Sequence, residues 1–398
     1  MTHPLSRRRF VGSMAATLGY LGFGPEASVL AQTRAGAAPA PAQPARATVE
    51  EYDAFAKLAN NENPWGPPES VMQAMTKAFK YANRYGYPDG GIVQAIADHH
   101  GVKPENVMLG AGSSEVLVVA DQTFLHDGKK VLSVEPTYGT VYQYATTTKA
   151  DAIKLPLTAD YRQDIPAMIK ATHHHYREIG FIYLCNPNNP TGVVVTKQEI
   201  KQLLDGIPAD MPVLIDEAYH HFVEDANYAT SVPYVIEGRP VIVARTFSKI
   251  VGLAGMRLGY AIAPKDIIDE MRPFSLNYGV NAIVKWGGVA ALKDTAAQQK
   301  VRTDTLALRK KTTADLEAYG YQVIPSETNF FMVHIGRQVV PVIDEFKKKG
   351  VLVGRPFPPM MEHLRVSVGN ADEMARFTTA FKEIFPPGGK KTTTVAQG

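Results

Sequence analysis

Short apolar runs alternate with longer stretches of helical spacing along most of the chain. Seven runs rich in β-branched residues predict strands at 107–110, 130–134, 152–155, 181–184, 213–215, 241–244 and 259–263. Segments such as 114–125 and 197–204 lie between them and have the apolar spacing of a helix face. This alternation favours an α/β fold with a seven-stranded, mostly parallel sheet and helices on both faces. Ligands of such sheets bind at the carboxyl ends of the strands.

A different pattern begins near residue 295. It predicts a long polar helix over 295–318, strands at 322–324, 330–334 and 364–368, and a helix near 342–349. We therefore expect a smaller α+β domain after the sheet. A chain of 398 residues, 45% of them hydrophobic, can support two such cores. The expected boundaries are an N-terminal arm at 48–76, a large domain at 77–294, a small domain at 295–388 and a disordered tail at 389–398.

The N-terminal segment differs in composition from the rest. Arg7, Arg8 and Arg9 precede a weakly apolar stretch, and the small residues up to Ala31 offer a cleavage site. Residues 1–31 resemble a twin-arginine export signal. The alternatives are a disordered basic N-terminus and, if cleavage fails, a short membrane anchor. An Ala- and Pro-rich flexible spacer follows at 32–47. We expect a periplasmic protein without a stable membrane anchor, because the apolar stretch is too short to span a bilayer.

Charge and cysteine content restrict the function further. Removing residues 1–31 takes away three arginines and one glutamate, which lowers the formal net charge from +3 to +1. A nearly neutral chain offers no electrostatic surface for nucleic acid. Cys185 is the single cysteine, so no intramolecular disulfide can form. Stability must come from packing, as in a protein that folds around a cofactor before export.

Lys249 is the strongest candidate for covalent chemistry. It lies in a small, apolar segment behind Thr246 and Ser248, with Arg257 eight positions further on. Burial disfavours the ammonium form, and only the neutral amine forms an imine with an aldehyde. The two hydroxyls and the guanidinium could hold a phosphate group. This pattern indicates an aldehyde cofactor that carries a phosphate, although an ordinary loop lysine is the alternative.

Polar residues also follow the other predicted strands. Gly112, Ser113 and Ser114 open a helix whose free N–H groups suit a phosphate, and one serine could cap that helix. Tyr138 follows the next strand, where its ring could stack on a heteroaromatic ring. A structural helix cap and a core tyrosine are the alternatives. Asn189 lies in a Pro- and Gly-rich turn that could direct its side chain at a ligand oxygen.

Asp216 ends a strand that should be buried, so its carboxylate needs a cationic or hydrogen-bonding partner. A protonated pyridine nitrogen is such a partner, and a ring held in that form can accept electrons from a carbanion. This is the chemistry of pyridoxal phosphate. Tyr219 could bind the ring hydroxyl and, with Asn189, tune the proton affinity of the imine.

These motifs occur in a specific order. Asn-Pro-Thr-Gly at 189–192, Asp-Glu-Ala-Tyr at 216–219 and Thr-Phe-Ser-Lys at 246–249 have spacings similar to those of class I/II aminotransferases. The histidinol-phosphate aminotransferase-like branch is the most similar. The resemblance covers about residues 56–385, including 58–66, 85–90 and 364–369.

The resemblance implies a fold-type I homodimer that binds pyridoxal 5'-phosphate on Lys249. It places Asp216 at the ring nitrogen, Asn189 and Tyr219 at the ring oxygen, and Tyr138 on the ring. The phosphate would lie among Gly112, Ser113, Ser114, Thr246, Ser248 and Arg257, with Tyr87 reaching in from the partner subunit.

For the substrate, the resemblance implies that Arg365 binds the carboxylate, and a bidentate guanidinium gives that role a physical basis; a surface arginine is the alternative. Arg355 and Asn63 are weaker candidates. His220 and His221 stand where many relatives have an acidic residue, either facing the pocket or forming a solvated pair. We interpret residues 173–175, three histidines, as a surface run and expect no metal site.

The implied activity is transfer of an amino group between an L-amino acid and a 2-keto acid, with Lys249, Asp216 and Tyr219 as catalytic residues. Lys249 would be both tether and base. A pyridoxal phosphate-dependent amino-acid oxidase, decarboxylase or racemase on the same scaffold is the alternative. A non-catalytic binding protein is a further alternative, but it would have no use for the electron-accepting arrangement.

Overall fold

The computed structural model describes residues 48–147, 151–276 and 279–388. The predicted export signal, the spacer and the C-terminal tail lie outside these residues. The chain divides into two units between residues 54 and 55. In the first unit, Val49–Ala54 form the short helix α3. Among the described helices, none combines the length and the apolar character needed to cross a bilayer.

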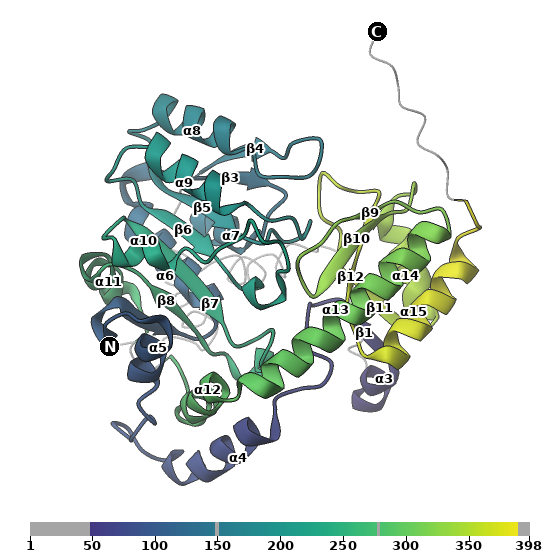
Figure 1. The fold of residues 1–398 in the computed structure, drawn as a ribbon, viewed down its shortest axis with the longest axis horizontal. Coiled ribbons are helices and arrows are strands. Elements are labelled where there is room, and N and C mark those ends of the chain that lie inside the picture. Colours follow the sequence, from purple (N-terminus) through teal and green to yellow (C-terminus); the bar gives the residue numbers. More distant parts are fainter. Residues whose placement is uncertain (1–47, 148–150, 277–278, 389–398) are drawn as a thin grey trace, which may run out of the picture. The chain divides into compact units, whose positions relative to one another are not determined.

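A seven-stranded sheet dominates the second unit, with strand order β2-β8-β7-β6-β5-β3-β4 (Figure 1). Strand β8 is antiparallel to both of its neighbours, β2 and β7, and the other neighbouring strands pair in parallel. All seven strands were expected from the sequence, with bounds that differ by at most two residues. The strands are β2 Val107–Gly110, β3 Lys130–Glu135, β4 Ala152–Pro156, β5 Ile179–Cys185, β6 Val213–Asp216, β7 Val241–Thr246 and β8 Gly259–Ile262.

Helices cover both faces of this sheet. Successive strand residues point to opposite faces, so in β5 Phe181 and Tyr183 join one apolar cluster and Ile182 and Leu184 join the other. The first face packs against α6 Ser113–Phe124, α7 Thr140–Thr147 and α11 Lys265–Met271. The second packs against α4 Glu69–Ala78, α5 Ile92–His100, α8 Ile165–His174, α9 Lys197–Gly206, α10 Val232–Ile236 and α12 Ala282–Lys293.

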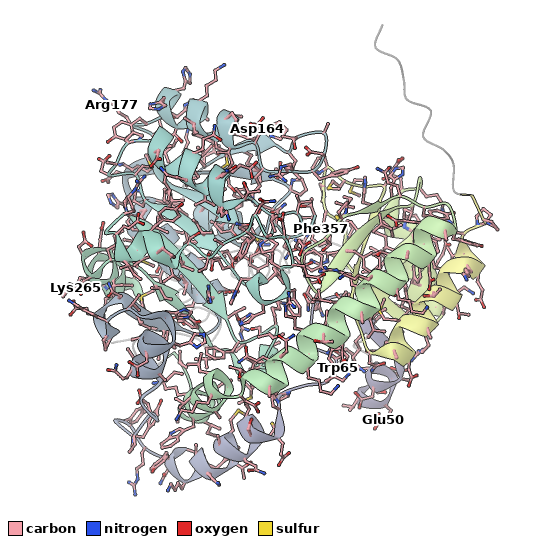
Figure 2. The ribbon with its side chains drawn as sticks, viewed as in Figure 1. Glu50, Trp65, Asp164, Arg177, Lys265 and Phe357 are labelled. Atoms are coloured by element: carbon pink, nitrogen blue, oxygen red, sulfur yellow. The ribbon has the colours of Figure 1, made fainter. Side chains whose placement is uncertain are left out.

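Side-chain caps explain where several helices begin. Asp164, labelled in Figure 2, accepts a hydrogen bond from the Ala167 N–H at the start of α8. Thr196 and Glu199 form a reciprocal capping box at the start of α9. Such caps satisfy N–H groups that the helix itself leaves free. Short 3-10 turns fill several connections: η1 Phe79–Tyr81, η2 Pro104–Asn106, η3 His126–Gly128, η4 His220–Phe222, η5 Ala254–Met256 and η6 Arg272–Phe274.

The C-terminal part has its own sheets and core. A three-stranded antiparallel sheet has the order β12-β10-β9, and β1 pairs in parallel with β11. The predicted helix over 295–318 is confirmed, as are the three predicted strands, whereas β1, β11 and α15 were not expected. The elements are α13 Thr295–Ala318, β9 Val323–Ile324, β10 Phe330–His334, α14 Val339–Lys348, β11 Val351–Val353, β12 His363–Ser367, α15 Ala371–Ile384 and β1 Ala56–Leu58.

The pairing of β1 brings the residues after it to the active-site region. Ala56 and Leu58 are fully buried in the C-terminal core, and the Lys57 N–H donates to the Glu373 carboxylate at the start of α15. Residues 59–61 leave this strand and line the cavity described below. The part of the chain expected as an arm therefore contributes both a core strand and a cavity wall.

Candidate active site

A cavity of about 330 Å³ lies where β5, β6 and β7 end and β12 approaches them. Its position agrees with the rule that parallel sheets bind ligands at the carboxyl ends of their strands. Twelve residues proposed from the sequence line it: Ser113, Ser114, Tyr138, Asn189, Asp216, Tyr219, Thr246, Ser248, Lys249, Arg257, Arg355 and Arg365. The structure thus brings together residues that are far apart in the sequence.

Three proposed residues do not line this cavity. Gly112 is adjacent to it as the N-cap of α6, and an added Cβ there would collide with the Arg257 guanidinium. Tyr87 lines a separate open cavity formed by residues 80–88. The Asn63 side-chain NH₂ donates a hydrogen bond to the Ile250 carbonyl, and its Oδ1 accepts one from the Trp65 N–H. The Asn63 side chain therefore stabilises a turn, and the structure does not bring it to the substrate side.

Lys249 follows β7 and extends its amine into the cavity. The amine donates to the Asn60 carbonyl at 3.2 Å and lies 5.6 Å from the centre of the Tyr219 ring. Burial, together with the positive charge of Arg365, lowers the pKa of Lys249 to about 8. A substantial fraction of this amine is therefore neutral near pH 8, as a nucleophile or base requires.

Asp216 lies at the end of β6 and is only 2% exposed. Its carboxylate accepts hydrogen bonds from the Tyr183 hydroxyl at 3.3 Å and the Ala218 N–H at 3.1 Å. No cationic side chain forms an ion pair with it within the described ranges. Burial raises the pKa of Asp216 to about 6. A cationic ligand group in the cavity would complete the surroundings of this carboxylate.

The residues predicted to bind a phosphate form a cluster of donors. The Thr246 hydroxyl donates to Ser248 Oγ at 2.8 Å, and Ser113 begins α6. Arg257 has a positive φ of 58°, and its guanidinium donates to the Ala111 and Ala254 carbonyls. The expected serine cap is wrong, because Gly112 is the N-cap and no side chain bonds the first turn. That turn keeps its N–H groups available, which suits a phosphate.

Arg365 enters the cavity from β12 and is 6% exposed. It donates to Asn189 Oδ1 at 2.7 Å and to the Ala59 carbonyl at 2.6 Å. Its Nε is buried and has no partner in the described part of the chain. Burial lowers the pKa of Arg365 to about 10. The guanidinium remains charged at neutral pH, as the binding of an anionic ligand requires.

Arg355 lies on the exposed wall of the same cavity. Its guanidinium is 4.3 Å from the centre of the Phe357 ring, which also lies 4.5 Å from the Arg365 guanidinium. One aromatic ring thus contacts both arginines, a favourable placement for cations.

Several cavity residues were not recognised in the sequence. Asn60 and Asn61 line the cavity, and so does the buried Cys185 beside Asp216. The segment 58–66 was part of the family resemblance, but the sequence did not show which asparagine faces the site. Asn61 has a positive φ of 54°, and this backbone conformation decides the direction of its side chain.

Glu217, His220 and His221 face a different region from Asp216. Glu217 is fully buried, and its carboxylate accepts from Arg245 at 2.7 Å and from the Ser231 N–H at 2.6 Å. His220 and His221 are not a solvated pair as expected, because buried ring nitrogens of both lack partners in the described residues. Burial and the charge of Arg245 lower the pKa of His221 to about 3.

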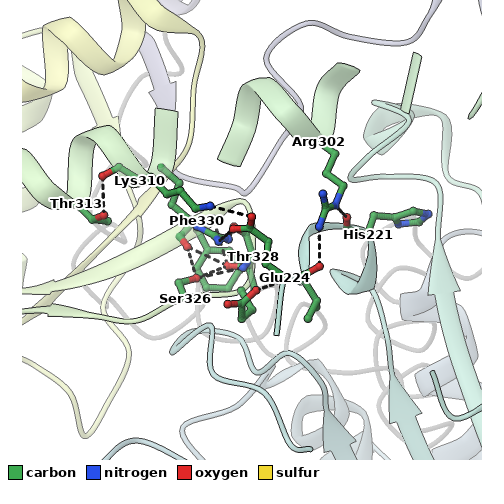
Figure 3. A network of polar contacts seen from close by, with 11 residues as sticks. His221, Glu224, Arg302, Lys310, Thr313, Ser326, Thr328 and Phe330 are labelled. Atoms are coloured by element: carbon green, nitrogen blue, oxygen red, sulfur yellow. Dashed lines mark hydrogen bonds and ion pairs between the residues drawn. The ribbon is translucent and has the colours of Figure 1, made fainter. Parts of the chain in front are cut away.

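Helix α13 links the segment after Tyr219 to the C-terminal sheet (Figure 3). Arg302 donates to the carbonyls of His221 and Val223 at 2.9 and 2.8 Å. Seven residues later, Arg309 donates to the Thr328 carbonyl at 2.6 Å. Two arginines on one helix thus connect both halves of the site.

The model of the family "Aminotransferase class I and II" matches residues 54–381. The chain belongs to this family. It is 36% identical over 334 residues to a histidinol-phosphate aminotransferase of Moorella thermoacetica, covering 82% of this chain and 85% of the relative. It is 34% identical over 339 residues to an aromatic amino acid aminotransferase of Rhodococcus jostii, covering 84% and 91%.

A solved structure supports the fold. The histidinol-phosphate aminotransferase of Sinorhizobium meliloti in complex with pyridoxal-5'-phosphate superposes with a TM-score of 0.77 at 24% identity, covering 88% of this chain and 98% of that one. The protein is a fold-type I, pyridoxal phosphate-dependent aminotransferase that uses amino acid and keto acid substrates. The residues around this cavity fit the cofactor, because they include an amine, a carboxyl without a cationic partner in the described residues and a cluster of donors suited to a phosphate.

Proposed function

We propose that Lys249 is both the attachment point of the cofactor and the base that moves the substrate's α-proton. One observation carries this assignment: the Lys249 amine, the Asp216 carboxyl and the Arg365 guanidinium line the same cavity. Bound pyridoxal phosphate withdraws electrons from the substrate's α-carbon. Asp216 holds the ring nitrogen in its protonated form, and Lys249 accepts and returns the proton in its neutral state.

Arg365 binds the substrate carboxylate and so orients the α-carbon toward Lys249. Its place in the cavity wall and its charge support this role. Histidinol phosphate and aromatic amino acids are the first donors to test, because they correspond to the names of the two relatives. Arg355, on the exposed wall, is placed to contact the distal part of the substrate.

A half-reaction experiment tests the proposal against the oxidase, decarboxylase and racemase alternatives. Purified holoenzyme is mixed with each amino donor under nitrogen, and the cofactor absorbance is recorded. We expect stoichiometric conversion to the aminated cofactor, reversed by addition of a 2-keto acid. Release of CO₂, consumption of O₂, or racemisation without amination of the cofactor would contradict the proposal.

The proposed assembly is a homodimer in which Tyr87 completes the cofactor site of the partner. Exposed aromatic side chains near Tyr87 support it, since Phe79 is 62% and Tyr85 91% exposed. Sedimentation should give twice the mass of one chain. A mixture of Lys249→Ala and Tyr87→Phe subunits should recover activity that neither variant has, because a mixed dimer contains one intact site. A monomer, or no recovery, would reject this arrangement.

Export through the twin-arginine route is proposed from Arg7, Arg8 and the small residues before Gln32. Replacing both arginines with lysine should keep the enzyme in the cytoplasmic fraction, whereas the unchanged chain should be periplasmic and shortened. Cytoplasmic retention of the unchanged chain would refute the proposal.

A further inference from the structure

Asn61 has an unusual backbone for a residue of its type. Only four non-glycine residues in the described chain have a positive φ: Asn61, Asp127, Tyr161 and Arg257. This conformation is unfavourable for residues with a side chain, although asparagine tolerates it better than most. Asn61 is also 1% exposed and lines the cavity. Strain of this kind at a site residue indicates that the orientation of the residue matters.

The hydrogen bonds of Asn61 fix the orientation of its amide group. The Asn61 N–H donates to Ser367 Oγ at 2.8 Å, so the Ser367 hydroxyl proton is free for another acceptor. That proton goes to Asn61 Oδ1 at 2.9 Å. With its oxygen directed at Ser367, the amide must present its NH₂ group on the other side. There, Asn61 Nδ2 donates to the Tyr219 hydroxyl oxygen at 2.9 Å.

Asn189 is fixed in the same way from the opposite direction. Its Oδ1 accepts from the Arg365 guanidinium at 2.7 Å, which leaves its NH₂ group facing Tyr219. The distance from Asn189 Nδ2 to the Tyr219 hydroxyl oxygen is 3.4 Å, longer than the Asn61 bond. Two amide groups therefore donate to one phenol oxygen, and the shorter bond comes from Asn61.

A phenol oxygen has two lone pairs and one proton. Because both lone pairs face amide donors, the hydroxyl proton of Tyr219 must point in a third direction, toward the cavity that Tyr219 lines. We infer that Asn61 is a positioning residue, set by Ser367, that makes the Tyr219 hydroxyl a donor to the oxygen of the group bound in the cavity. This inference rests on the proposed function.

The same arrangement connects Tyr219 to the substrate side. Ser367 and Arg365 lie two positions apart on β12 and therefore on the same face of that strand. Ser367 reaches Tyr219 through Asn61, and Arg365 reaches it through Asn189. One strand thus sets both the carboxylate-binding guanidinium and the direction of the phenol proton.

Substitutions at Asn61 distinguish the effect of its side-chain amide from the effect of its backbone conformation. Asn61→Asp keeps the size of the side chain but offers the phenol an acceptor, so the Tyr219 proton turns away from the cavity. Asn61→Gly accepts the positive φ and removes the amide. Asp127→Gly is the matched control, because it relieves a positive φ at an exposed turn outside the cavity. Ser367→Ala leaves Asn61 in place but no longer fixes its amide.

The readout is a pH titration of the cofactor absorbance in each holoenzyme. A hydroxyl that donates to the ring oxygen stabilises its negative charge and lowers the proton affinity of the neighbouring lysine–cofactor linkage. We expect the apparent pKa of this titration to rise by about one unit in Asn61→Asp, by less in Asn61→Gly and Ser367→Ala, and not at all in Asp127→Gly. The turnover number for the amino donor should fall about tenfold in Asn61→Asp, with a smaller change in KM.

An unchanged titration in both Asn61→Asp and Ser367→Ala would overturn the inference. If Asn61→Asp fails to fold, Ser367→Ala decides alone, since a shift supports the inference and no shift rejects it. Failure of the proposed function would look different, because the unchanged protein itself would then show no lysine-linked cofactor spectrum or would not aminate its cofactor in the half-reaction.

Discussion

Two neighbouring carboxylates, Asp216 and Glu217, face opposite sides of the chain at the end of β6. On the cavity side, Asp216 has two neutral donors and no cation within the described ranges. On the ion-pair side, which we define as Glu217 and Arg245 with the nearby histidines 99, 100, 220 and 221, Glu217 binds Arg245, Thr230 and Ser231. Both carboxylates are buried, but only Glu217 has a full set of protein partners.

The difference shows how burial alone fails to identify a functional group. Burying a carboxylate is costly unless a cation and hydrogen bonds compensate. The chain supplies both to Glu217, whose role is therefore structural. It supplies Asp216 with hydrogen bonds but with no ion pair in the described residues, and Lys249, Arg257 and Arg365 line the same cavity. Substitutions on the cavity side should change chemistry, and those on the ion-pair side should change stability.

Lys249→Ala should have the largest effect on the cavity side. Turnover should fall by at least about 10²–10⁴-fold because the base is lost, and the lysine-linked absorbance should disappear. The melting temperature of the cofactor-free protein should change little. Lys249→Arg is the matched control that keeps a charge but cannot form the linkage. Undiminished transamination in either variant would contradict the assignment of Lys249 as the base.

Glu217→Gln tests the ion-pair side. It leaves the Arg245 guanidinium buried without its carboxylate, which should lower the free energy of unfolding by about 3–5 kcal/mol. Urea denaturation with cofactor-free protein measures this quantity. The folded holoenzyme of this variant should retain the normal cofactor spectrum. A catalytic defect with normal stability would place Glu217 with Asp216 instead.

Asp216→Asn should impair catalysis without loss of stability, the opposite of the result expected for Glu217→Gln. Loss of the charge at the ring nitrogen should lower kcat by about 10²–10³-fold, the usual scale for removing one preorganised electrostatic contact. The free energy of unfolding should stay the same or increase slightly, since a buried charge without a cation is removed. Steady-state kinetics and urea denaturation on one preparation decide between these effects. A large loss of stability with normal kcat would be inconsistent with our assignment.

Arg365→Lys sharpens the description of the cavity side. Lysine keeps the charge but loses the planar fork and the bonds that position Asn189. We expect KM for the amino acid to rise about 10- to 100-fold, in line with a charged hydrogen bond. Arg355→Lys serves as a comparison on the exposed wall and should have a smaller effect. Equal effects of both substitutions would contradict the assignment of the substrate carboxylate to Arg365 rather than to Arg355.

The smallest expected effect is the pH dependence of the ion-pair side. The pKa of His100 is lowered to about 3 in the folded protein, chiefly by burial and then by Arg245. Its ring therefore stays neutral when folded but binds a proton when unfolded below about pH 6.5. Stability should fall with decreasing pH, by about 1 kcal/mol at pH 5.5 for this ring.

His100→Asn should reduce that slope between pH 6.5 and 5. Asp216 contributes with the opposite sign, because its pKa is raised to about 6 and the folded protein holds its proton more tightly. Urea midpoints across this pH range measure both contributions. An identical slope in His100→Asn would show that the ring is already solvated in the folded protein.

The sequence predicted the large sheet and most of the cavity, because parallel strands place their carboxyl ends together. Asp216, Asn189 and Lys249 each follow a strand that an apolar run reveals. Asn61 was missed because three asparagines in one segment look alike, and its positive φ depends on distant Ser367 and Asn329. Strand β1 was missed because its three residues gain stability only by pairing with β11. The half-buried setting of His220 and His221 likewise depends on packing that no local pattern records.

The pairing of β1 with β11 has a consequence for synthesis of the chain. Ala56 pairs with Val351, 295 positions later, so β1 leaves the ribosome long before its partner exists. Contacts between such distant segments form late, because a long loop must close first. The strands that carry Asp216 and Lys249 can assemble earlier, whereas Asn60, Asn61 and Arg365 reach their places only when almost the whole chain is available. A nascent chain therefore has no complete site, and catalysis begins only after the final folding step.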